Sequence, residues 1–304
     1  MNNVDQAAAV QRAPVILAPS KPGWLTLPLW QWALLLGLCG YLYYQITGKL
    51  VEDWWIDPNF SHGFFVPLFS GFLIWEERDK LSRIPAKFSW LGLPIIAGSL
   101  GVLVVGVLGA ELFLQRTSMI LLAAGMIIFF LGWRFFRAVL FPWVFLFLMV
   151  PIPAILFNQI TFPLQLLASQ LASSVLPVFG VPVLREGNVI QLPSMPLEVA
   201  EACSGIRSLI SLFTLAVIYG YFLEPKVSRR VLLALAALPI AVAANAFRIV
   251  GTGLMVQFWD PDKALGFFHE FSGWVIFIIS LSLLFGFHTL LRYLFHDRTG
   301  EAAA

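Results

Sequence analysis

One short stretch of the chain holds residue types that carry out covalent chemistry. It reads Glu201-Ala202-Cys203-Ser204-Gly205-Ile206-Arg207, and a long apolar run begins at Ile206. A thiol at the start of a helix is biased toward the nucleophilic thiolate by the helix dipole, and the cationic Arg207 one turn further on adds to that bias. Cys203 is therefore a candidate nucleophile. The alternative is a small buried residue at a helix entrance.

A second candidate lies inside a later apolar run. Placing Arg248 within a membrane span costs at least ~2.5 kcal/mol, so an arginine there indicates function by default. Asn245, Arg248 and Thr252 are spaced at i, i+3 and i+7, so they share one helix face that we expect to look into a helix bundle. Arg248 would stabilise a developing oxyanion. The alternative is a structural arginine bonded to backbone carbonyls.

Histidines supply the third type of residue. His269 lies just before the last apolar run, and His62 lies in Ser61-His62-Gly63 near the start of the second. We predict that His269 is the acid–base partner of Cys203 and that His62 is a reserve base, while a solvated interfacial histidine is the alternative for His269. His288, deep in the last run, is predicted to be structural. A cysteine, a histidine and an arginine form a complete set for acyl transfer.

The composition defines the setting of this chemistry. The chain has 304 residues, of which 59% are hydrophobic and only 12% charged, as in a polytopic membrane protein and unlike a soluble globule. The net charge of +2 gives no indication of nucleic acid as a partner, so the lipid bilayer is the expected environment. The two cysteines, Cys39 and Cys203, do not make a disulfide framework. No residue spacing indicates a metal or a phosphate loop, so we expect no cofactor.

The apolar runs predict an all-α polytopic membrane protein with about eight transmembrane helices. They cover residues 27–47, 64–75, 90–109, 118–133, 138–150, 206–223, 231–255 and 274–294. Before the sixth span, residues 154–178 predict an amphipathic helix along the surface, and residues 181–200, punctuated by proline and glycine, predict a small β-hairpin. Residues 1–26 and 295–304 are predicted tails, the first of them mobile.

The distribution of charges between the runs predicts the orientation. Lysine and arginine collect in the even-numbered connections and acidic residues in the odd-numbered ones, so the positive-inside rule places both tails in the cytoplasm. Segments 151–205 and 256–273 then face outward. This topology brings Cys203, Arg248 and His269 to the same depth at the outer face.

At these residues the chain resembles the exosortase family of bacterial membrane transpeptidases, most of all the exosortase A type, which is related to the archaeosortases. The resemblance rests on Glu201-Ala202-Cys203-Ser204-Gly205, on Asn245-x-x-Arg248-Ile249 and on His269 ahead of a final span, with Ser61-His62-Gly63 as an upstream signature. It covers nearly the whole chain. Residues 27–294 are therefore expected to form one exosortase-like transmembrane domain.

The resemblance implies a cysteine peptidase or transpeptidase of the bacterial inner membrane with its active site on the periplasmic face. Its substrates would be exported, membrane-anchored proteins with a C-terminal Pro-Glu-Pro signal, a transmembrane helix and a basic tail, associated with exopolysaccharide export. Cys203 would form a thioester, Arg248 would stabilise the oxyanion, and an acceptor of unknown identity would resolve the thioester. His269 would act as acid and base, or only electrostatically, because archaeosortases carry arginine there.

Two further expectations concern the substrate signal and competing functions. Arg185, in the predicted hairpin, would bind the glutamate of the Pro-Glu-Pro motif, and a solvated loop residue is the alternative. A multi-span transporter, or a non-catalytic protein of polysaccharide-export assembly, is the alternative to an enzyme.

Overall fold

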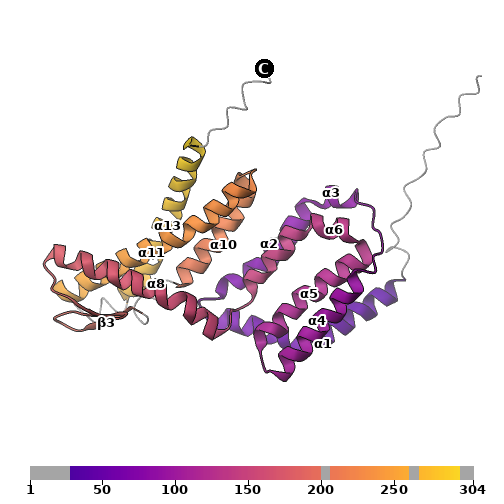
Figure 1. Ribbon diagram of the computed structural model, residues 1–304, viewed down its shortest axis with the longest axis horizontal. Helices are drawn as coiled ribbons and strands as arrows, with labels where there is room; N and C mark the ends of the chain where they lie inside the picture. Colours follow the sequence, from indigo (N-terminus) through magenta and orange to yellow (C-terminus); the bar gives the residue numbers. More distant parts are fainter. Residues whose placement is uncertain (1–27, 200–205, 260–266, 295–304) are drawn as a thin grey trace, which may run out of the picture. The chain divides into compact units, whose positions relative to one another are not determined.

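The computed structural model describes residues 28–199, 206–259 and 267–294. The predicted tails, and the segment from Glu201 to Gly205 with Cys203, lie outside the described residues. The described chain is mainly helical (Figure 1). It divides into two compact units: one contains Pro67–Phe147 with the chain up to Lys49, and the other contains Leu50–Val66 with the chain from Leu148 onward.

The predicted apolar runs form helices in the first half of the chain, and short helices also form in two of the connections between them. The helices are α1 (Leu29–Ile56), α2 (Phe65–Glu76), α3 (Arg78–Ser82), α4 (Gly92–Leu108), α5 (Leu112–Leu131), α6 (Trp133–Ala138), α7 (Leu140–Phe145) and η3 (Leu146–Met149). Within the first unit α4 packs along α5.

Two other connections extend the helices of neighbouring runs. The residues after Lys49, which lie between the first two predicted runs, continue α1 to Ile56. The segment before residue 118 belongs to α5, because the Glu111 side chain caps this helix by accepting a hydrogen bond from the Phe113 N–H at 3.3 Å. As a result Arg116 lies inside a helix and is only 2% exposed.

The second unit holds the segments that carry the candidate chemistry. Its elements are η2 (Ser61–Phe64), α8 (Ala154–Val175), η4 (Leu176–Phe179), β1 (Leu184–Glu186), β2 (Val189–Gln191), β3 (Pro196–Glu198), α10 (Ile206–Leu223), α11 (Val227–Phe258) and α13 (Phe267–Leu294). Helix α11 contacts α8, α10 and α13 (Figure 1). Three helices that follow the sheet in sequence therefore pack as one bundle.

The predicted hairpin is confirmed, and a third strand extends it. In the described chain the strands form an antiparallel sheet of order β1-β2-β3, and Gly187 makes the turn between β1 and β2 with φ +65°, which glycine adopts without strain. Ile190 and Leu197 pair across the sheet and are buried with Leu176 and Ile249. This apolar cluster seats the sheet on η4 and α11.

Among the described residues, four helical segments are long and apolar enough to cross a membrane. They are Leu112–Leu131, Ala154–Phe179, Val227–Phe258 and Phe271–Leu294. Three shorter apolar helices cover Gly92–Leu108, Leu140–Met149 and Ser208–Leu223. The count of eight spans therefore stays a prediction. So does the surface position of α8, because this helix forms where predicted but has the length and hydropathy of a span.

Candidate functional site

Arg248 lies in α11, and its guanidinium is held by the second turn of α13. Its Nε donates a hydrogen bond to Ser272 Oγ at 3.2 Å. Gly273, the next residue, lies against the same group, since a Cβ built on it would be 3.6 Å from Nη2. Two consecutive residues of α13 therefore fix the direction of the Arg248 side chain.

The predicted polar face of α11 does look into the bundle. Asn245 and Thr252 are 6% and 4% exposed, whereas Phe247 is 65% exposed. Arg248 itself is partly buried between these two sides. Arg248 therefore projects from the buried polar face of α11, while Phe247 lies on the exposed side of the helix.

The backbone of His269 lies near Arg248 in the fold. The prediction places His269 just before the last span, which begins at residue 274, but α13 begins at Phe267 and includes His269. Its backbone lies three residues before Ser272, which is about one helical turn. The structure thus brings Arg248 and the backbone position of His269 to the same end of the α11–α13 pair.

Cys203 lies outside the described residues, but the structure anchors the chain on both sides of it. Val199 is fully buried, and its N–H donates to Asn188 O at 3.0 Å. On the other side α10 begins at Ile206, and Leu212 is buried against α11 and α13. Residues 200–205 lie between these two anchored segments in the sequence. The other predicted supporting residues of the segment, Glu201, Ser204 and Gly205, fall in the same gap.

The predicted reserve base, His62, is anchored in η2. Its Nε2 lies 3.0 Å from the carbonyl oxygen of Leu148. Burial lowers the pKa of His62, and the carbonyl groups of Leu148 and Asn59 oppose that shift by favouring the protonated ring. A neutral ring whose Nε2–H donates to Leu148 fits this environment.

The glycine of the same motif has a packing role. A Cβ at Gly63 would overlap the indole ring of Trp54. That indole N–H donates to Met149 O at 2.8 Å, beside the carbonyl that His62 contacts. The Ser61-His62-Gly63 motif therefore docks η2 onto the segment that enters α8, and this packing accounts for the glycine without invoking catalysis.

The two remaining predicted arginines lie on different elements. Arg185 is exposed on β1, and its Nη1 donates to the carbonyl of Gly187 at 2.9 Å in the adjoining turn. Arg207 is the second residue of α10, as the helix-start prediction required, and its side chain lies outside the description.

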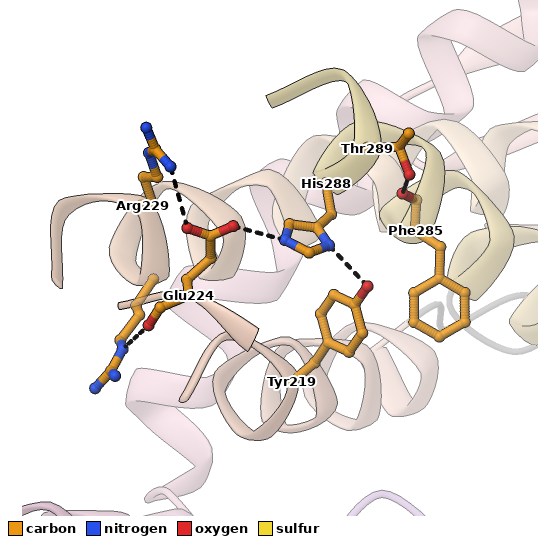
Figure 2. Close-up of polar contacts among 7 residues, drawn as sticks. Tyr219, Glu224, Arg229, Phe285, His288 and Thr289 are labelled. Atoms are coloured by element: carbon orange, nitrogen blue, oxygen red, sulfur yellow. Dashed lines mark hydrogen bonds and ion pairs between the residues drawn. The ribbon is translucent and has the colours of Figure 1, made fainter. Parts of the chain in front are cut away.

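Sequence reasoning missed a buried polar cluster around Glu224, which Figure 2 shows. His288 Nε2 lies 2.7 Å from Glu224 Oε1, and its Nδ1 lies 2.8 Å from the Tyr219 hydroxyl. Arg229 Nη1 is 3.6 Å from the other carboxylate oxygen of Glu224. Glu224 and His288 are only 2% and 4% exposed. The signal was present in the sequence as a histidine inside the last apolar run and a glutamate directly after the sixth, since ionisable residues are costly within a membrane.

Together these features define a helical protein with candidate membrane spans and an arginine, Arg248, on the buried polar face of α11. The transmembrane exosortase family model matches residues 54–286, most of the chain, and the chain belongs to this family. Transmembrane exosortases are membrane cysteine peptidases or transpeptidases. Searches of curated proteins and of solved structures give no match.

Proposed function

We propose that this chain is a cysteine transpeptidase that cleaves membrane-anchored exported proteins at a C-terminal Pro-Glu-Pro sorting signal. The active site faces the periplasm from the bacterial inner membrane, and both termini are cytoplasmic. The observation that carries the proposal is the hydrogen bond from the Arg248 guanidinium in α11 to Ser272, which lies one turn after His269 in α13. Its substrates belong to exopolysaccharide-associated export.

The chemistry proceeds in two acyl transfers. The Cys203 thiolate attacks the scissile carbonyl carbon, and the tetrahedral oxyanion is stabilised by Arg248. The C–N bond breaks, the leaving amine takes a proton from His269, and a thioester to Cys203 remains. A nucleophilic acceptor, an amine or water, then gives its proton to His269, attacks the thioester and releases the Cys203 thiolate.

A trapped acyl-enzyme tests this proposal directly. Purified protein incubated with a sorting-signal substrate and quenched in acid is expected to carry a substrate fragment on Cys203, detected by mass spectrometry of its peptides. Hydroxylamine should release that fragment, because it cleaves thioesters. Cys39 in α1 is the internal control thiol, and a fragment on Cys39, or none on either cysteine in a preparation that cleaves substrate, contradicts the mechanism.

The sheet edge supports a role for Arg185 in binding the signal. The bonds Leu192 N–H to Met195 O and Val199 N–H to Asn188 O fix the alternation of the ladder, so Ile190 between them directs its N–H and C=O toward β3. Arg185, opposite Ile190, then directs its own N–H and C=O away from the sheet. In the described part of the chain no strand pairs with that edge.

An extended Pro-Glu-Pro segment is suited to this edge. Residues of a strand alternate in the direction of their N–H groups, so a central glutamate can pair with Arg185 while both prolines, which lack an N–H, face away. The glutamate side chain then lies opposite the Arg185 guanidinium. A guanidinium has five N–H donors, so its bond to Gly187 leaves capacity for a carboxylate.

Charge reversal tests this pairing. Arg185→Glu should lower kcat/KM for the Pro-Glu-Pro substrate by roughly 10- to 100-fold, the value of one charge-assisted hydrogen bond. A Pro-Lys-Pro substrate should recover most of the loss with this variant and be poor with wild type. Glu198→Lys, on the opposite edge strand, is the matched control and should leave both substrates unchanged. Normal processing of Pro-Glu-Pro by Arg185→Glu rules out Arg185 and directs attention to Arg207.

A further inference from the structure

We propose that Tyr219, Glu224 and His288 form a positioning cluster that aligns α13 with α10 and α11. Through that alignment the cluster sets the relative position of the candidate catalytic groups at the opposite end of these helices. The inference rests on the proposed function, because the effect of the alignment is measured as the rate of the proposed reaction. None of the three residues is proposed to touch substrate.

The cluster joins three helices at one point (Figure 2). Tyr219 comes from α10, His288 comes from α13, and Glu224 directly follows the last residue of α10. The third helix, α11, takes part through its third residue, because Arg229 Nη1 lies 3.6 Å from Glu224 Oε2. Arg230 Nε donates to the main-chain oxygen of Glu224 at 2.6 Å.

Both nitrogens of the His288 ring have a partner, and this restricts how α13 can sit. One nitrogen contacts the Glu224 carboxylate and the other the Tyr219 hydroxyl, at 2.7 and 2.8 Å. A slip of α13 by one residue would shift the ring by about 1.5 Å and rotate it by about 100°. Such a move would break both bonds and leave a buried carboxylate poorly paired, which is strongly destabilising.

The apolar contacts between the same helices do not impose that restriction. Leu212, Ala237 and Leu284 pack in one buried cluster, and burial of apolar surface is non-directional. Alternative alignments would bury similar aliphatic surface. The polar cluster therefore supplies the directional part of the packing, the role best attested for buried polar groups.

The alignment at one end governs the other because the helices are long. Ser272 lies 16 residues before His288 in α13, or about 24 Å along the helix, and Arg248 lies 19 residues after Arg229 in α11, or about 28 Å. Ser272 and Arg248 contact each other at 3.2 Å. The α11–α13 pair is thus tied at two separated points. Loss of the contacts at Glu224 therefore lets α13 shift relative to α11 at Arg248 and Ser272, although neither of these two residues is changed.

Kinetics of graded variants test the proposal. His288→Leu removes both contacts and should lower kcat roughly 100-fold, the cost of about 1 Å of misplacement at a reacting centre. His288→Gln keeps a donor toward Glu224 and should recover part of that loss. Tyr219→Phe removes one hydroxyl and should lower kcat about 3- to 10-fold. In each variant KM should stay within about twofold of wild type, because the substrate site is not touched.

Thr289→Val is the matched control. It removes an exposed hydroxyl that bonds only to Phe285 O within α13, next to His288 in sequence, and should leave kcat unchanged. Tyr219→Phe keeps the ring and its packing, so it remains informative if His288→Leu does not insert. Wild-type kcat in Tyr219→Phe and His288→Gln, or a change confined to KM, overturns the positioning role. Normal processing by Cys203→Ala overturns the proposed function itself, a separate arm of the same assay.

Discussion

Cys203→Ala is expected to abolish cleavage of the sorting signal while the protein still inserts into the membrane. In the proposed mechanism the thiol sulfur forms the acyl-enzyme, and removal of a nucleophile typically costs at least about 10³-fold in kcat. Cys203→Ser should be nearly as inactive, because a serine hydroxyl is far less ionised than a thiol at neutral pH and is the weaker nucleophile. Cleavage is measured by the shift of a tagged substrate on gels and by mass spectrometry of its product.

Cys39→Ala provides the matched control for this variant. Cys39 lies in α1 and contacts Met126 in the first unit, so its removal should leave cleavage intact. Thermal unfolding in detergent should be the same for all three variants. Wild-type cleavage by Cys203→Ala would exclude a thioester mechanism and favour the non-catalytic assembly role.

Local sequence signals predicted the elements that depend on local patterns. The start of α10 at Ile206 follows from the change from a polar segment to an apolar run, and the hairpin follows from short runs punctuated by proline and glycine. The buried stripe of Asn245 and Thr252 follows from helical spacing. These features required no knowledge of distant partners, and the structure confirms them.

The remainder depends on contacts between distant residues, which periodicity does not encode. His288 and Glu224 are 64 residues apart, and each alone looks like an isolated polar residue beside an apolar run. Gly63 is explained only once Trp54 is seen against it. The continuation of α1 to Ile56 was missed because acidic and tryptophan residues suit both an interfacial loop and a helix end.

The Arg248 contacts in particular could not have been read from the chain. Helical spacing places Arg248 on an interior face but says nothing of the neighbour it meets there. The structure supplies that neighbour as Ser272 and Gly273, from the helix that also carries His269. The sequence alone predicts that an intramembrane arginine is functional, and the structure adds that its Nε is bonded to Ser272.

Arg248→Lys is expected to lower kcat by about 10²- to 10³-fold, as the loss of one oxyanion donor does elsewhere. Lysine keeps the positive charge but offers one compact ammonium group in place of a planar fork. The guanidinium bonds Ser272 through Nε, and in the proposed mechanism it also donates to the oxyanion, whereas a single ammonium group lacks this planar arrangement of donors. KM should change little, since the donor acts on charge that develops only in the transition state.

Two companion variants separate catalysis from support of the fold. Ser272→Ala removes the hydroxyl that accepts a hydrogen bond from Arg248 Nε and should lower kcat about 3- to 10-fold. Phe247→Leu changes an exposed side chain next to Arg248 on the outward side of α11 and should leave kcat unchanged. A structural arginine would give a different pattern, with Arg248→Lys cleaving at the wild-type rate but unfolding at a lower temperature. That pattern would leave the oxyanion to be stabilised by other donors, with the Arg207 side chain and the N–H groups at the start of α10 as the next candidates.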